Sequence, residues 1–352
     1  MKLELIERVK PGEILGKSIL AFDGKILLNQ GTKLNTSYIN RIKGMGVYYI
    51  YVNDSDLEDV EVSDSFLIEL KRSAMSSFSG IMKNTLLIQD RKEALEVIKT
   101  LEELIQYIAE NADINKSLND IQTHNNQRYV HSMEVCVMSV FLGKAMKLKR
   151  DQLKELGLAA ILHDVGMAKI SPKILEKNGE YTPEELLLLR EHPNKGYEIL
   201  KQNIGIPESA LKAVLQHHER IDGKGYPNGL LGYQISKYAK IIAVCDMYDL
   251  VTNNDNYKKS FRPYDAYELI IGGSSYIFDE EVVFSFRKTF SVYPLGSCVK
   301  LSNGIEGYVV KQNANFPDRP VLRVIYDKDH ESIEPYEIDL VEDINVVIKC
   351  II

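Results

Sequence analysis

The spacing of apolar residues changes twice along the 352-residue chain. Residues 1–54 hold short apolar runs separated by glycines, and 26–28 and 47–52 have the length and composition of β-strands. Between about residues 57 and 290, apolar residues recur at intervals of three and four, which is typical of helices packed on a core. Beyond about residue 293 short apolar runs return, with the turn-forming pair Asn303-Gly304 between two of them. The pattern predicts a mainly α protein, in which a helical bundle is flanked by small β-rich modules.

These changes of period predict four segments: a β-rich N-terminal module (1–54), a helical linker region (55–114), a helical domain (115–290) and a small β-rich C-terminal module (291–352). Helices are expected at 36–43, 66–88, 91–114, 132–146, 151–162, 207–217, 235–251 and 263–271. Asp151 is the expected N-cap of one helix, and Thr182-Pro183 predicts the start of another that ends before His192-Pro193. The long helices between 66 and 114 could pair in a homodimer or pack in an ordinary core, and both interpretations stay open.

The composition narrows the classes of partner. The net charge is −7, which argues against a nucleic-acid polymer because phosphates require clustered Lys and Arg. The four cysteines form no Cys-x-x-Cys pair, and Cys136 and Cys245 lie in apolar runs, so we expect buried thiols in a reducing compartment. No stretch approaches the roughly 20 apolar residues of a membrane span, and residues 1–9 lack the apolar run of a signal peptide. We therefore expect a soluble cytoplasmic protein.

Histidines and aspartates occur in the helical domain at positions that suit a metal site. His163-Asp164 and His217-His218 are adjacent pairs of possible ligands, and imidazole with carboxylate suits iron, manganese and similar ions. Asp246 lies in an apolar helix, where an unpaired carboxylate is costly to bury. Each has an ordinary explanation on its own: the His-His pair could be chance, and Asp246 could pair with a Lys or Arg.

Two single histidines extend this set. His131 alone could be a surface residue, and His192 before Pro193 could simply end a helix. The order of all these residues along the chain makes a shared site the better explanation. Two metal ions about 3.5–4 Å apart would clamp a phosphodiester and supply a hydroxide nucleophile.

The motifs from His163 to Asp249 resemble those of the HD-GYP family, whose members are helical HD-superfamily phosphohydrolases that degrade cyclic di-GMP. The similarity covers roughly residues 115–290 and rests on His163-Asp164-Val165-Gly166, His192-Pro193, the run from His217 to Pro227, and Asp246-Met247-Tyr248-Asp249. The resemblance implies two divalent metal ions, iron or alternatively manganese, with Asp164 as the bridging ligand. The implied metal ligands are His131, His163, Asp164, His192, His217, His218 and Asp246. Tyr226, between Gly225 and Pro227, would line the pocket for the dinucleotide.

Three positions depart from the family pattern. Some members bind a third metal through a Glu four residues before the first histidine, where this chain has Gln127, so we expect two metals. The usual Lys after the His-Asp-x-Gly turn is Met167, and Lys169 is the candidate that could replace its charge at the reacting phosphate. Asp255 stands at a usual Arg, which leaves Lys258 and Lys259 as candidate substrate contacts.

The missing cations predict a slow enzyme. A lost Lys or Arg contact worth ~2–4 kcal/mol in the transition state lowers the rate about 10²–10³-fold. The sequence therefore predicts a metal-dependent cyclic dinucleotide phosphodiesterase of reduced activity. The alternative is a receptor that binds the cyclic dinucleotide without cleaving it, although a pure receptor has little need of seven metal ligands.

Overall fold

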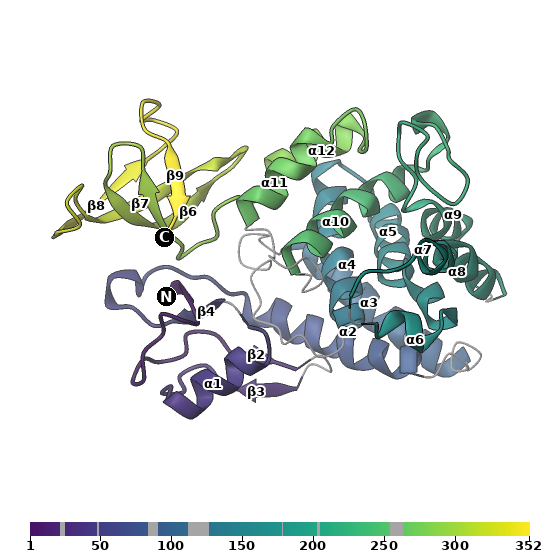
Figure 1. The fold of residues 1–352 in the computed structure, drawn as a ribbon, viewed down its shortest axis with the longest axis horizontal. Helices are drawn as coiled ribbons and strands as arrows, with labels where there is room; N and C mark the ends of the chain where they lie inside the picture. Colours follow the sequence, from purple (N-terminus) through teal and green to yellow (C-terminus); the bar gives the residue numbers. More distant parts are fainter. Residues whose placement is uncertain are drawn as a thin grey trace. The chain divides into compact units, whose positions relative to one another are not determined.

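The computed structural model describes residues 1–21, 25–47, 49–83, 91–111, 127–177, 179–202, 205–253 and 263–352 (Figure 1). They form two compact units. One unit comprises residues 1–68 and 287–352 and is rich in β-strands, whereas the other comprises 69–111 and 128–286 and is helical. The mainly α class predicted from the apolar spacing is confirmed, and the two terminal segments share one unit.

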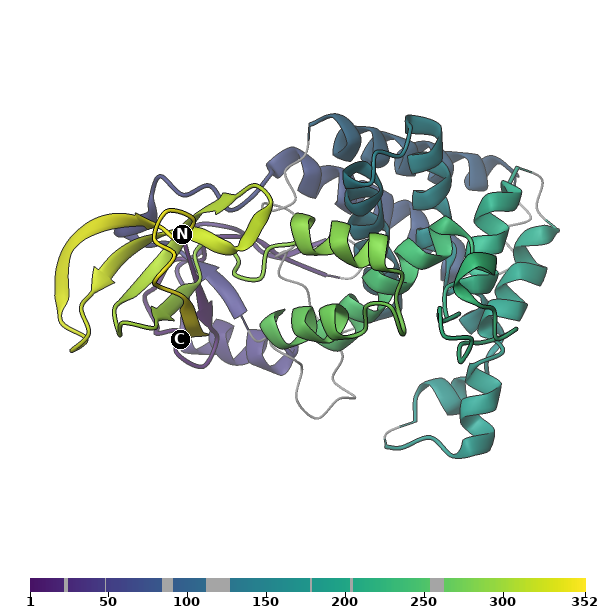
Figure 2. The same cartoon turned by 90° about the horizontal axis from the view of Figure 1, so that it is seen from above.

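The helical unit is built from a series of helices that Figure 2 shows from a second direction. Its helices are α2 (Ser65–Lys83), α3 (Arg91–Glu110), α4 (Gln127–Ala145), α5 (Arg150–Leu162), α6 (Pro172–Leu175), α7 (Pro183–Leu189), α8 (His192–Lys201), α9 (Glu208–Gln216), α10 (Lys237–Asn253), α11 (Pro263–Gly272) and α12 (Glu280–Thr289). Two 3-10 turns are η4 (Val165–Lys169) and η5 (Gly232–Gln234). The first turn of α2 and the last residues of α12 belong to the other unit.

Helix α4 runs through the core of this unit. Every residue from His131 to Gly143 is buried, as expected for a helix that is surrounded by other helices. Helix α3 packs closely on α5, because a Cβ at Gly157 would lie 2.5 Å from Cδ1 of Ile105. Ile105 and Leu104 are almost fully buried. The described part of α3 therefore has a core role.

Local capping signals explain several helix ends. Thr182 caps α7 as predicted: its Oγ1 accepts from the N–H of Glu185 at 3.3 Å, and the Glu185 carboxylate accepts from the N–H of Thr182 at 2.7 Å. The predicted N-cap at Asp151 is wrong, since Lys149 caps α5 and Asp151 lies in its first turn. His192-Pro193 begins α8 instead of ending a helix, because a proline in the first turn lacks only an N–H that would have no intrahelical partner.

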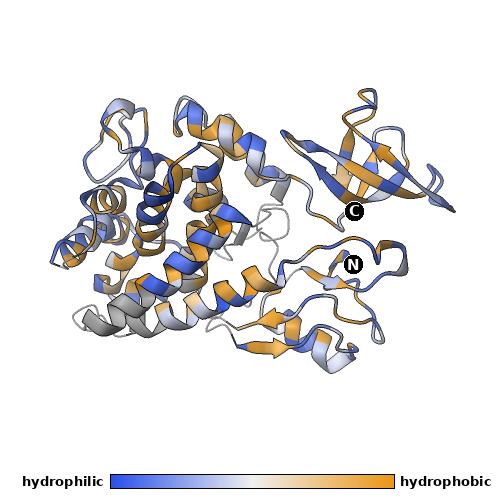
Figure 3. Cartoon of the chain, turned by 180° about the vertical axis from the view of Figure 1, so that it is seen from behind, coloured by the Kyte–Doolittle hydropathy of each residue, from blue (hydrophilic) through white to orange (hydrophobic). Residues whose placement is uncertain are grey.

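The other unit combines three antiparallel sheets. Strands β1 (Lys2–Leu5) and β4 (Tyr49–Val52) form one pair, and β2 (Ile19–Leu20) and β3 (Ile26–Leu28) form another, with helix α1 (Thr36–Gly44) and the turn η1 (Ser55–Leu57) completing the N-terminal segment. The third sheet has the order β8-β7-β6-β5-β9. Its strands are β5 (Cys298–Leu301), β6 (Glu306–Asn313), β7 (Phe316–Tyr326), β8 (Ser332–Asp339) and β9 (Ile348–Ile351). Apolar and polar residues alternate along these strands (Figure 3).

Hydrogen bonds to main-chain carbonyls join the N-terminal segment to the C-terminal segment. The N–H of Leu3 donates to the carbonyl of Gly296 at 2.9 Å, and the hydroxyl of Tyr51 donates to the carbonyl of Leu295 at 3.2 Å. Strand β1 was absent from the sequence prediction because its residues alternate in charge and it lies against a strand more than forty residues away. Both segments thus depend on each other for a complete set of backbone partners.

Arg323 of β7 provides a charged link between the two segments. Its guanidinium donates to both carboxylate oxygens of Asp59 at 2.7 Å, to the carbonyl of Asp56 at 2.7 Å and to Glu337 at 2.8 Å. The hydrogen bond from Arg323 lowers the pKa of Asp59 to about 2. A depressed carboxylate pKa contributes stability above its unfolded value and loses it as the pH falls through the folded value.

We expect Arg323→Gln to lower the melting temperature of this unit near neutral pH, because the paired carboxylate loses its fork of donors. The deficit relative to the unchanged chain should shrink as the pH falls from about 4 toward 2, where Asp59 becomes protonated in both proteins. Thermal melts across this pH range provide the measurement, with Arg41→Gln, at an exposed position of helix α1, as the charge-matched control. Equal melting temperatures for the two substitutions at neutral pH would contradict the link.

Candidate metal centre

Several helices of the helical unit bring the predicted ligands together, through residues in their interiors or at their ends. His131 lies on α4 and Asp246 on α10, while the others lie at helix boundaries. His163 follows α5, Asp164 precedes η4, His192 is the first residue of α8, and His217 and His218 follow α9. All seven predicted ligands lie in one cluster, and six of them, all except Asp246, form two groups with metal-ligand spacing.

Asp164 belongs to both groups. In one group the possible ligand atoms of Asp164, His192, His217 and His218 all lie within 4.8 Å of one another, and in the other the same holds for His131, His163 and Asp164. Oδ1 of Asp164 lies 3.2 Å from Nε2 of His192, whereas Oδ2 lies 3.8 Å from Nε2 of His163. The two oxygens of this carboxylate therefore face different groups, which is the geometry of a bridging ligand.

Asp246 lies at the border of both groups. Its Oδ1 is 3.1 Å from Nε2 of His131 and 3.8 Å from Nε2 of His163, and its Oδ2 is 3.8 Å from Nδ1 of His218. The side chain is buried, and the contacts of this carboxylate within the described part of the chain are with histidines. The alternative of a Lys or Arg partner for Asp246 thus receives no support.

Three of the histidines are oriented by the same backbone contact. Nδ1 of each lies 2.7–2.8 Å from the carbonyl oxygen three residues earlier, for the pairs His163–Ala160, His192–Leu189 and His217–Val214. A carbonyl can only accept, so Nδ1 donates in each pair and Nε2 is the ring nitrogen that faces the cluster. Nε2 of His163 is buried without a hydrogen-bond partner, as expected for an atom that awaits a cation.

His131 is oriented by a carboxylate instead. Its Nδ1 donates to Oδ2 of Asp249 at 2.7 Å, and Asp249 is buried on the same helix as Asp246. Such carboxylate–histidine pairs fix the ring and raise the basicity of the nitrogen that faces the metal. Sequence reasoning gave Asp249 no role, although its spacing of three residues from Asp246 places both on one face of a helix.

The electrostatics of the cluster favour a divalent cation. Burial and the neighbouring imidazoles lower the pKa of His217 and of His218 well below the usual value, so both rings are neutral. Burial alone would raise the pKa of Asp164, but the surrounding histidines lower it to a net value far below its usual range. Burial would also raise the pKa of Asp246, but the interaction with His131 outweighs burial and lowers it. Burial disfavours charge on His131, but its hydrogen bonds with Asp246 and Asp249 outweigh burial and raise the pKa of this ring. Ionised carboxylates beside the neutral imidazoles of His217 and His218 form a donor set that fits divalent metal ions.

The glycine after Val165 sets the distance between two ligands. A Cβ at Gly166 would lie 1.9 Å from the carbonyl oxygen of His192 and 2.5 Å from the N–H nitrogen of Gly196. Turn η4 can therefore press against the start of α8 only because residue 166 has no side chain. This contact places Asp164, directly before η4, beside His192.

The Gly-Tyr-Pro loop folds back over His218. Buried Glu219 accepts from the N–H groups of Asn228 at 2.7 Å and Leu230 at 2.9 Å, and a Cβ at Gly225 would lie 2.3 Å from the backbone nitrogen of Arg220. The ring of Tyr226 consequently stacks on the ring of His218, with centroids 4.7 Å apart and planes at 26°. The Tyr226–Pro227 peptide bond is cis. The role of Glu219 as the anchor of the loop was not predicted.

The remaining predicted site residues are less informative. Lys169 ends η4 and is exposed, and no hydrogen bond or ion pair joins it to the cluster within the described ranges. Met167 is partly buried in the same turn, and Gln127 begins α4. Lys258, Lys259 and Asp255 lie outside the described residues. Cys136 and Cys245 are buried as predicted, and burial raises the pKa of the Cys245 thiol to about 12.

Known families match two parts of the chain. The model of the HD domain matches residues 114–282, and that of a KOW domain associated with the HD domain matches residues 298–352. The helical region therefore belongs to the HD domain family, and its motifs and relatives place it in the HD-GYP group. The predicted family is confirmed. No helix among the described residues is long and apolar enough to cross a membrane.

Curated relatives are named as cyclic dinucleotide phosphodiesterases. A cyclic di-GMP phosphodiesterase of Pseudomonas aeruginosa is 35% identical over 60% of this chain and 50% of its own length. A cyclic di-GMP phosphodiesterase of Thermotoga maritima is 30% identical over 60% of this chain and 56% of its own, and a 3'3'-cGAMP-specific phosphodiesterase of Vibrio cholerae is 30% identical over 40% of this chain and 33% of its own. The chain thus spans about half the length of the first two of these relatives and a third of the other.

A solved structure supports the fold. The HDG"Y"P protein from Bdellovibrio bacteriovorus has a TM-score of 0.54 with this chain at 17% sequence identity. The alignment covers 80% of this chain and 97% of the other. At this identity the similarity establishes the fold, and the chemistry must be argued from the residues of the site.

Proposed function

We propose that the chain is a metal-dependent phosphodiesterase that hydrolyses cyclic di-GMP or a related cyclic dinucleotide. The observation that carries the proposal is Asp164, whose two oxygens face two groups of histidines. A site that holds two metal cations suits a phosphodiester, because the phosphate group of this substrate is anionic. The substrate class follows from the names of the relatives, which act on cyclic di-GMP or 3'3'-cGAMP.

The residues divide the work of such a site. His131, His163, Asp164, His192, His217, His218 and Asp246 would hold two divalent ions, iron or alternatively manganese. When bound, the pair supplies a hydroxide nucleophile near neutral pH and positive charge at the phosphate oxygens. Tyr226, carried between Gly225 and Pro227 and stacked on His218, would line the pocket for the dinucleotide. Lys258 and Lys259 are proposed as further contacts, and Lys169 as a charge beside the reacting phosphate.

The first experiment is to purify the protein without oxygen, measure metal per chain, and incubate it with cyclic di-GMP and with 3'3'-cGAMP. Chromatography then separates the cyclic substrates from linear dinucleotides and mononucleotides. Two metals per chain with a linear or mononucleotide product from either substrate supports the proposal. Metal-loaded protein that leaves both substrates intact during long incubation would sink it.

A receptor without catalysis is the second candidate, and Met167 is the observation that favours it. The residue stands in η4, three positions after Asp164, where its uncharged side chain cannot assist a developing negative charge. Submicromolar binding of a cyclic dinucleotide without product would decide for the receptor. Absence of binding would count against both candidates.

Met167→Lys is expected to raise turnover about 10- to 100-fold, since a cation near the reacting phosphate stabilises charge that gathers in the transition state. Because the residue is only partly buried, the longer polar side chain can extend to solvent without unfolding the turn. The measurement is kcat at saturating cyclic di-GMP, with Met247→Lys on α10 as the control for added charge. Unchanged turnover would show that charge at position 167 does not limit the rate.

A further inference from the structure

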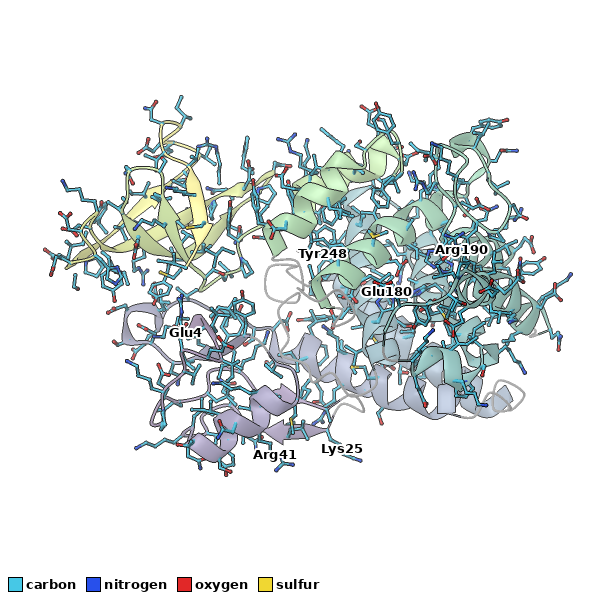
Figure 4. The ribbon with its side chains drawn as sticks, in the orientation of Figure 1. Glu4, Lys25, Arg41, Glu180, Arg190 and Tyr248 are labelled. Carbon is cyan, nitrogen blue, oxygen red and sulfur yellow. The ribbon has the colours of Figure 1, made fainter. Side chains whose placement is uncertain are left out.

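Arg190 stands at the edge of the metal centre, where sequence reasoning assigned nothing. It is the C-cap of α7 and precedes His192, a member of the cluster, by two residues. Its guanidinium carbon lies 5.4 Å from the ring centroid of Tyr226, in the geometry of a cation–π contact. Figure 4 labels Arg190 in the part of the helical unit that contains α7 and α8.

Tyr226 connects this arginine to the cluster. Its ring stacks on His218 at a centroid distance of 4.7 Å, and the ring of His192 lies 6.4 Å away. Arg190 is therefore separated from two members of the cluster by a single aromatic ring. A cation in this position is close enough to meet a substrate that lies on the metal centre and touches Tyr226.

The donors of Arg190 are available to a ligand. The side chain is exposed, and within the described ranges no carboxylate lies at ion-pair distance from it. By contrast, Arg220 of the same site donates to both oxygens of Asp222, at 3.1 and 2.7 Å. A cation–π contact does not use up the N–H donors of a guanidinium, which can still form a fork with a phosphate.

Arg190 adds a positive charge at a site where η4 supplies none from position 167. The carboxylates of Asp164 and Asp246 lie in the metal-ligand cluster near Tyr226, whereas η4 offers the uncharged Met167 at the position of the family's lysine. A cyclic dinucleotide carries two negatively charged phosphates, and a cation at the edge of the site attracts them. Arg190 reaches the site from the α8 side, independently of η4.

We propose that Arg190 is a substrate-binding residue, which stacks on Tyr226 and binds a phosphate of the cyclic dinucleotide through its guanidinium. The inference rests on the proposed function and adds a specific contact to it. Tyr226 then has two tasks: it lines the pocket with its ring and holds the guanidinium in place. The arginine supplies charge on the substrate that Met167 does not supply.

Arg190→Gln tests the proposal, and the chain offers a matched control in Lys201→Gln. Lys201 also stacks on a tyrosine at 5.4 Å, that of Tyr197 on the same helix, and its loss changes the net charge equally. With metal-loaded protein, we expect Arg190→Gln to raise the Kd and the KM for cyclic di-GMP about 10- to 100-fold. Metal per chain should stay unchanged, and Lys201→Gln should leave all three quantities within about twofold of the unchanged chain.

Two further variants separate a specific contact from a structural effect. Arg190→Lys keeps the charge without the fork and should restore only part of the affinity. In a Tyr226→Leu background, which removes the stacking ring, Arg190→Gln should cost clearly less than it does in the unchanged chain. A cost that is the same in both backgrounds would remove Tyr226 from the proposal and thereby overturn it.

Further outcomes would decide against the inference or against the proposed function. Arg190→Gln with an unchanged Kd, or with the same small change as Lys201→Gln, overturns the inference while cyclic dinucleotide hydrolysis by the unchanged chain keeps the proposed function intact. Loss of metal in Arg190→Gln also overturns it, because the residue would then act on the cluster. If the unchanged, metal-loaded chain neither binds nor cleaves a cyclic dinucleotide, the proposed function itself fails.

Discussion

Asp164→Asn is expected to abolish phosphodiesterase activity, with a loss of at least about 10³-fold, and to lower the metal content of the chain. One oxygen of Asp164 lies 3.2 Å from His192 and the other 3.8 Å from His163, so the carboxylate serves both groups. Asparagine preserves the shape but removes the negative charge and replaces one acceptor by a donor. Neither metal would then have its shared anionic ligand.

The measurement combines metal per chain with the rate of product formation from cyclic di-GMP. Asp151→Asn, the same exchange at an exposed position in the first turn of α5, provides the control and should retain metal and activity. Full metal content together with full turnover in Asp164→Asn would show that Asp164 does not join the two groups. Circular dichroism of both variants establishes whether the helical unit remains folded.

Gly166→Ala is expected to reduce activity about 100-fold and to lower the melting temperature. The added Cβ would lie 1.9 Å from the carbonyl oxygen of His192, so η4 and the start of α8 must move apart. That movement separates Asp164 from His192, and a displacement of about 1 Å in a catalytic site costs on the order of 10²-fold in rate. Because backbone meets backbone at this point, no side-chain rotation relieves the contact.

Gly272→Ala is the matched control, because a Cβ at Gly272 would meet nothing within 4 Å and the residue ends a helix of the same unit. It should leave activity and melting temperature close to those of the unchanged chain. If Gly166→Ala instead binds metal and turns over normally, the contact between η4 and α8 is softer than its geometry implies. Paired melts and rates of the two variants distinguish these outcomes.

Much of the helical fold follows from local signals that a sequence displays. The three- and four-residue apolar spacing predicted the helices, and the Thr182 cap predicted the start of α7. Boundaries were less secure. The N-cap of α5 is Lys149, which is not a typical capping residue. His192-Pro193 begins α8, because proline is tolerated in the first turn of a helix as well as after its end. Strand β1 could not be predicted from its local sequence, because its partner strand is distant along the chain.

The candidate site likewise contains residues that the sequence identified and residues that only the structure identified. Motif order and the family resemblance together were enough to select the seven residues that the fold brings together, although each of them has an ordinary explanation on its own. Asp249, Glu219 and Arg190 were not selected, since each acts through a tertiary contact: with His131, with the backbone of a loop, and with the ring of Tyr226. Spacing along one helix hinted only at Asp249.

The pairing of the chain's two ends in one unit has a consequence for synthesis on the ribosome. The backbone N–H of Leu3 donates to the carbonyl of Gly296, so this contact cannot form until the C-terminal segment has been synthesised. At about 5–20 residues per second the delay is on the order of ten seconds or more, during which the helical unit emerges and can fold. Throughout that interval the contacts of Leu3 and Tyr51 with residues 295 and 296 cannot form, so the N-terminal segment completes its packing only after the helical region has been synthesised.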